Sequence, residues 1–129
     1  MSNLIQINEP REISRITELI HDYWLDASLI VFDSEKSTLS IRCLKGLESQ
    51  SAFVNRFRFP AVEYFLRISR VESFSVEDKQ KVRFYDVVSV AYDATLKCVE
   101  LRTGVPIGIK VFVTGLDLTV EETGTVVQG

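Results

Sequence analysis

Near the N-terminus, hydrophobic side chains recur at helical spacing. Pro10 suits the first turn of a helix, because its missing N–H is not needed there, and Asn8 or Glu9 could cap that turn. The apolar stripe that follows consists of Ile13, Ile16, Leu19, Ile20, Tyr23 and Trp24. The charged residues Arg15, Glu18 and Asp22 fall on the opposite side. This pattern predicts an amphipathic helix of about four turns that ends near Asp26 and buries one face.

After this segment the period changes from helical to alternating. Leu39, Ile41 and Cys43, for example, are separated by polar residues, as in a strand with one buried face. A short apolar run at residues 29–32 also reads as a strand, and further strand runs cover residues 53–68 with a break at Pro60, 88–92, 96–102, 107–113 and 116–120. The connections are short, of about two to five residues, which favours hairpins and antiparallel pairing.

These patterns predict an α+β fold, in which one N-terminal amphipathic helix packs on a curved, mostly antiparallel sheet of about seven strands. A barrel-like form with the helix across its mouth is an alternative. The segment 60–76 is open between strand and helix, since the residues from Ala61 to Arg67 suit both. No internal repeat or linker is visible, so we expect a single domain over residues 1–129.

Composition limits the class of protein. The chain has 129 residues, 46% hydrophobic and 26% charged, and these values are typical of a globular domain. The net charge of −3 argues against nonspecific binding of nucleic acid, although residues 56–83 carry seven basic and four acidic side chains. No signal peptide and no run of about 18 apolar residues is present, so we expect a cytoplasmic protein without membrane contact.

The two cysteines, Cys43 and Cys98, both lie in runs that read as strands. We expect two buried free thiols, because free cysteine usually packs as a small hydrophobe. A bridge between them would require that their strands be neighbours.

His21 is the only histidine, and with Asp22 and Asp26 it forms one candidate polar site. Adjacent helical residues point about 100° apart, so Asp22 is poorly placed to orient His21. No zinc or calcium spacing and no phosphate-binding glycine loop accompanies them, so we expect no metal and no cofactor.

A second candidate is a row of basic residues, Arg56, Arg58, Arg67 and Arg70. Alternation places Phe57 and Phe59 on the face opposite Arg56 and Arg58, which suits a core with arginines in water. The sequence therefore favours a noncatalytic protein-interaction or oligomerisation module, with the arginine row as its surface. The alternative is a small-molecule binder or minor enzyme with a pocket beside the helix end, formed by His21, Asp22 and Asp26.

Overall fold

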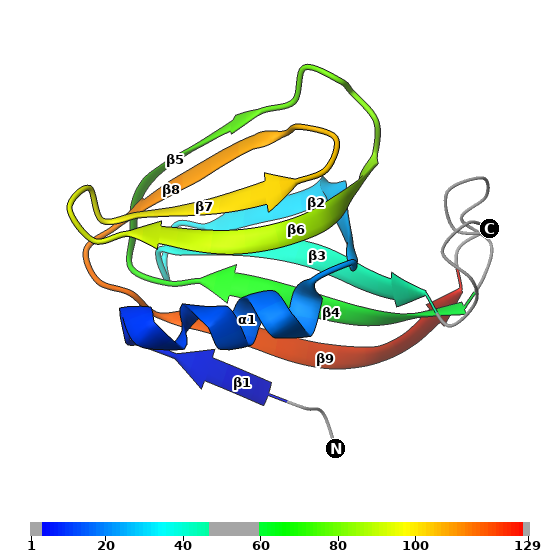
Figure 1. Ribbon diagram of the computed structural model, residues 1–129, viewed down its shortest axis with the longest axis horizontal. Helices are drawn as coiled ribbons and strands as arrows, with labels where there is room; N and C mark the ends of the chain where they lie inside the picture. Colours follow the sequence, from blue (N-terminus) through cyan, green and yellow to red (C-terminus); the bar gives the residue numbers. More distant parts are fainter. Residues whose placement is uncertain (1–3, 47–59, 128–129) are drawn as a thin grey trace.

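The computed structural model describes residues 4–46 and 60–127, which form a nine-stranded sheet and one short helix (Figure 1). The elements in chain order are β1 (Leu4–Ile7), the 3₁₀ turn η1 (Pro10–Glu12), α1 (Ile13–Ile20), β2 (Trp24–Asp33), β3 (Thr38–Gly46), β4 (Pro60–Ile68), β5 (Val71–Glu77), β6 (Phe84–Asp93), β7 (Cys98–Thr103), β8 (Gly108–Val113) and β9 (Leu118–Val127).

The strand order is β1-β9-β4-β3-β2-β6-β7-β8-β5. Each pairing between described strands is antiparallel, which confirms the prediction of a mostly antiparallel sheet. The sheet is open, with β1 and β5 at its two edges, and is not a closed barrel. The expected seven strands were too few because β1 is short and β5 was left undecided. Segment 60–76, which the sequence left open between strand and helix, forms strands β4 and β5 and not a helix. The predicted strand at 53–59 lies outside the described residues.

The sheet bends over itself and encloses the main core. Figure 1 shows β5, β8 and β7 in one layer, and β3, β4 and β9 in the other. Fully buried side chains come from both layers, among them Ile41 and Leu66 on one side and Leu101 and Ile109 on the other. These residues belong to sets that occupy every second strand position, so one face of each of these four strands stabilises the fold by hydrophobic burial.

The two halves of the sheet have matching orders. Apart from β1, the order reads the same from either end when β2, β3, β4 and β5 are exchanged with β6, β7, β8 and β9. The first hairpins match in detail: Asp33 pairs with Thr38, and Asp93 pairs with Cys98. Each aspartate accepts two backbone N–H bonds in its turn, of 3.1 and 3.3 Å at Asp33 and of 2.9 and 3.1 Å at Asp93.

The sequence conceals this likeness. Over residues 30–43 and 90–103, only Asp33/Asp93 and Arg42/Arg102 are identical. The other positions keep hydrophobicity and turn chemistry without identity. The expectation of no repeat therefore holds for the amino-acid sequence but not for the topology of the sheet.

The helix is shorter than predicted, since it ends at Ile20 and not near Asp26. His21 has an extended ψ of 132°, and Asp22 has a φ of 70°. The chain reverses here so that Trp24 can begin β2 and Leu25 can pair with Tyr85. Tyr23 is still buried against the core, so the apolar pattern was read correctly as burial and incorrectly as continued helix.

Helix α1 packs against the part of β6 that does not pair with β2. Strand β2 pairs with β6 only from Trp24 to Asp26. Beyond that point, the Thr17 hydroxyl donates to Val90 O at 3.2 Å and accepts from Val90 N at 3.0 Å. The apolar face of the helix, with Ile16 and Ile20 fully buried, then fills the space beneath.

Candidate interaction site at the open sheet edge

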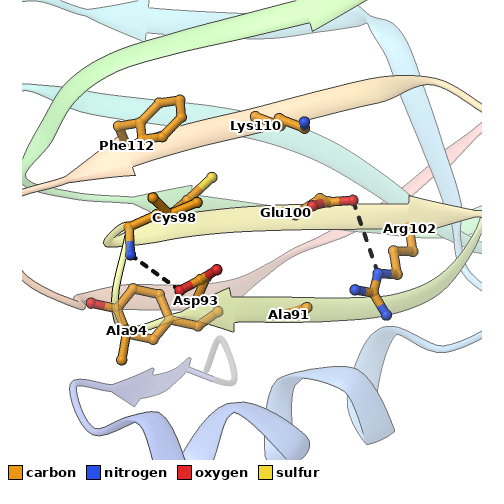
Figure 2. Close-up of a pocket in the computed structure, with 10 residues that line it drawn as sticks. Ala91, Asp93, Ala94, Cys98, Glu100, Arg102, Lys110 and Phe112 are labelled. Carbon is orange, nitrogen blue, oxygen red and sulfur yellow. Dashed lines mark hydrogen bonds and ion pairs between the residues drawn. The ribbon is translucent and has the colours of Figure 1, made fainter.

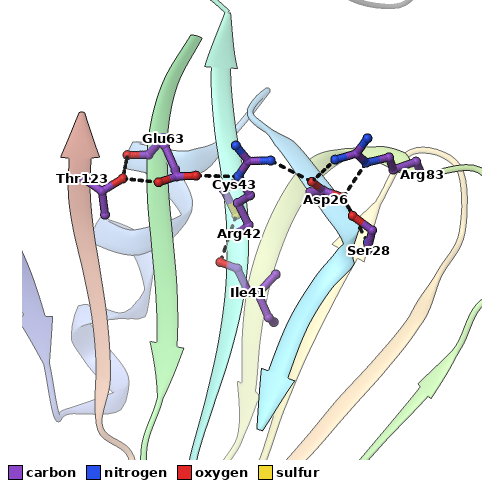
Figure 3. A network of polar contacts seen from close by, with 8 residues as sticks. All are labelled: Asp26, Ser28, Ile41, Arg42, Cys43, Glu63, Arg83 and Thr123. Carbon is purple, nitrogen blue, oxygen red and sulfur yellow. Dashed lines mark hydrogen bonds and ion pairs between the residues drawn. The ribbon is translucent and has the colours of Figure 1, made fainter. Parts of the chain in front are cut away.

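A polar network that spans several strands surrounds Asp26 (Figure 3). Asp26 is completely buried, and its carboxylate accepts bonds of 3.0 Å from Arg42 Nη1 and of 3.1 Å from both Nε and Nη2 of Arg83. Ser28 adds a hydroxyl bond of 2.6 Å and a backbone N–H bond of 3.0 Å. Burial alone would raise the pKa of Asp26, but the bonds from Arg83, Ser28 and Arg42 outweigh it, so its pKa lies below the ordinary value.

The network continues across the sheet and is fully satisfied. Arg42 Nε donates to Glu63 Oε2 at 2.6 Å, and the Thr123 hydroxyl donates to Glu63 Oε1 at 2.5 Å. Figure 3 shows these side chains as a row across β2, β3, β4 and β9. Among the described residues, no buried side-chain nitrogen or oxygen lacks a partner. The network therefore fixes strands to one another, and its carboxylates already serve as partners of Arg42, Arg83, Ser28 and Thr123.

The predicted polar site does not assemble as one unit. His21 Nε2 and Asp22 Oδ2 are 3.5 Å apart, whereas a continued helix would have separated them. They meet because the helix ends before them. His21 Nδ1 also lies 3.0 Å from Val88 O. Asp26, in contrast, is engaged by the two arginines and not by His21.

The arginine row is described only in part, because Arg56 and Arg58 lie outside the described residues. Arg67 is half-buried, pairs with Glu121 at 2.8 Å and covers the Phe65 ring at 5.4 Å. Arg70 is exposed in the β4–β5 turn with a φ of 56°, and it packs across the backbone of Gly115. Arg67 is thus neutralised within the sheet, whereas Arg70 reaches solvent.

A trough of about 500 Å³ lies on the outer face of β6, β7 and β8 (Figure 2). Its acids and bases offset each other: Glu100 is the cross-strand partner of Lys110, and Arg102 Nε lies 4.0 Å from Glu100. Cys98 also lines the trough, but burial raises the pKa of its thiol. A protonated, buried thiol is a poor nucleophile.

Both cysteines are free and buried, as predicted. Burial and the nearby Asp26 carboxylate raise the pKa of the Cys43 thiol to about 12. Neither thiol is therefore activated for catalysis in the folded state.

The open edge at β5 has a different character, because it exposes apolar side chains. Phe74 pairs with Val111, and Val76 pairs with Ile109, so both point toward the core side of the sheet. Even so, Phe74 is 40% exposed and Val76 is 37% exposed. Phe32 of β2 extends this surface, since its ring centroid lies 5.1 Å from that of Phe74 and its side chain is 38% exposed. We call Phe32, Phe74 and Val76 the β5 edge patch.

The sequence analysis missed this patch because β5 was not recognised. The alternating letters Phe74, Ser75 and Val76 were available as a signal. They predict a strand with one buried face, however, and only the sheet order shows that this face of β5 is uncovered.

Comparisons with known proteins add no assignment: no family model, curated protein or solved structure matches the chain. In the described part of the chain, His, Cys, Asp and Glu side chains form no group of three or more that could hold a metal ion. Over the same residues, no helix has the length and apolar character needed to cross a membrane.

Proposed function

We propose that this protein is a noncatalytic protein-interaction module, and that it binds its partner through the edge of β5 and the β5 edge patch. The observation that carries the proposal is the exposure of Phe32, Phe74 and Val76 on the side of the sheet that is buried elsewhere. Aromatic side chains that are partly exposed at a sheet edge are typical anchors of protein interfaces.

The chemistry of the other sites supports this choice over an enzyme. Asp26 is engaged by two cations. In the trough, Glu100 lies opposite Lys110, and the Asp93 carboxylate accepts two backbone N–H bonds in its own turn. Raised thiol pKa values argue against Cys43 and Cys98 as nucleophiles. The proposed surface is not the arginine row, which stays a prediction at Arg56 and Arg58.

A second candidate function is the binding of a small apolar molecule beside the helix. A recess of about 300 Å³ lies there, lined by Leu4, Ile5, Leu19, Tyr64 and Val120. Its polar group is the Tyr64 hydroxyl, which donates to Glu122 at 3.2 Å, and not His21 as the sequence suggested. Saturable binding of an apolar fluorescent probe, lost in Leu19→Trp, would favour this function.

The interaction proposal is tested by affinity capture from the source organism at about 0.15 M salt. We expect one stoichiometric partner with the native chain, and its loss with Phe74→Ser combined with Val76→Ser. Val105→Ser is the matched control, because Val105 is 44% exposed in the β7–β8 connection. Equal capture by all three proteins would contradict the proposal.

A further inference from the structure

The matching halves of the sheet differ at their edges. Exchange of the halves places β5 where β9 lies, at the outer side of β8 and β4 respectively. The outer side of β9 is covered by β1, which pairs antiparallel from Leu4 opposite Glu121 to Ile7 opposite Leu118. The outer side of β5 has no such cover among the described residues.

The cover on the β9 side buries apolar surface. Ile7 of β1 is only 1% exposed, and helix α1, which follows after the turn η1, packs against β6 and buries Ile16 and Ile20. On the β5 side, the corresponding space is bordered by the β5 edge patch, which stays about two-fifths exposed. The fold thus contains one filled and one unfilled version of the same strand site.

From this difference we infer that β5 accepts an extended segment of a partner protein as a further antiparallel strand, in the place that corresponds to β1. The inference rests on the proposed function and names the form of the partner. Backbone groups along the free side of β5 supply pairing, and alternate partner side chains cover Phe74 and Val76. Strand addition of this kind needs no rearrangement of the sheet, because the edge is already extended.

Charge indicates the chemistry of that segment. Glu72 and Glu77 are exposed on β5, and neither forms an ion pair with another described residue. The cations Lys79 and Lys81 follow the strand in its connection to β6. A partner strand with basic residues between apolar ones would complement the carboxylates of Glu72 and Glu77. A second copy of β5 would instead bring carboxylates against carboxylates.

The experiment uses three fluorescent seven-residue peptides with blocked ends and the full-length protein. One peptide alternates Lys and Val, one alternates Glu and Val, and one is the Lys peptide with proline at its centre. We expect the Lys peptide to bind at least about tenfold more tightly than each of the others, measured by anisotropy at low salt. Proline matters because it removes a backbone donor from the added strand.

Variants identify the site on the protein. We expect Glu77→Lys to weaken binding of the Lys peptide and to strengthen binding of the Glu peptide. Glu18→Lys makes an equal charge change at an exposed position of α1, and we expect it to alter neither. Equal binding of the Lys and proline peptides, or no response to Glu77→Lys, would overturn the inference. Self-association in light scattering that Phe74→Asp abolishes would overturn it in favour of a second copy.

The two levels of the proposal fail separately. If capture of the partner depends on Phe74 and Val76 but no peptide binds, the inference of a basic strand is wrong and the proposed interaction function stands. If capture is insensitive to Phe74 and Val76, the proposed function itself is wrong.

Discussion

The side-chain hydroxyl of Thr17, in helix α1, forms hydrogen bonds with both the backbone N–H and the backbone C=O of Val90, in strand β6. The Thr17 hydroxyl accepts from Val90 N at 3.0 Å and donates to Val90 O at 3.2 Å. A side chain here replaces the neighbouring strand that β6 lacks at this point. This contact explains how one short helix can satisfy backbone groups of β6 at a position where β2 does not pair with it.

We predict that Thr17→Val lowers the free energy of unfolding by about 1–3 kcal/mol, because it leaves the N–H and C=O of Val90 without partners. Urea denaturation measures the change. Thr17→Ser keeps the hydroxyl and should restore most of the stability. A valine variant as stable as the native protein would show that water replaces the hydroxyl at no cost.

We predict that Asp26→Asn destabilises the fold by about 3–5 kcal/mol, because the buried Arg42 and the half-exposed Arg83 would lose the buried carboxylate that they share, and Arg42 would keep only Glu63 as its counter-ion. Glu35→Gln, at the exposed β2–β3 turn, is the control and should change stability little. Thermal and urea unfolding at pH 7 give the comparison. A loss below about 1 kcal/mol would mean that the network does not clamp the strands.

The same pair of proteins should show a specific dependence on pH. The folded-state pKa of Asp26 is lowered, so its stabilising contribution is present above the unfolded pKa of about 4 and is lost as pH falls through the folded value. The stability difference between native protein and Asp26→Asn should therefore be constant near neutrality and shrink below about pH 4. A difference that shrinks between pH 6 and 8 would assign the effect to another group.

Packing at the β5 edge patch should contribute less to stability than packing in the core. We expect Phe74→Ala to cost about 1 kcal/mol, since the ring is already 40% exposed, and Leu66→Ala, fully buried in β4, to cost about 2–5 kcal/mol. Chemical denaturation at one protein concentration compares them. Equal losses would show that Phe74 is an ordinary core residue and would remove the reason to regard it as a binding surface.

The thiols should react with a disulfide reagent far more slowly in the folded protein than in about 6 M urea, where the burial that raises their pKa values is gone. Reagent release followed by absorbance counts both groups. Fast reaction of Cys43 in the native state would contradict its complete burial.

Much of the fold could be predicted from the sequence because alternation is a local property. The period-2 runs at Leu39–Cys43 and Ile107–Val113 became β3 and β8 with the expected residues buried, and the cysteines were correctly read as buried thiols. The turn aspartates Asp33 and Asp93 ended their strands where their side chains could accept two backbone N–H bonds.

Local pattern alone misplaced the end of the helix. Tyr23 and Trp24 continue the helical stripe in the sequence, yet Trp24 belongs to β2. Pairing of Trp24 and Leu25 with both β3 and β6 outweighs helical propensity, because it connects the two halves of the sheet.

The sequence by itself determined the alternating core positions of strands such as β3 and β8 and showed which segments extend, since both depend on neighbours a few residues apart. The tertiary structure decided that Asp26 meets Arg42 and Arg83, that β1 covers β9, and that β5 stays uncovered. These relations join positions from 16 to more than 100 residues apart. They depend on strand order and register, which short-range periodicity does not encode.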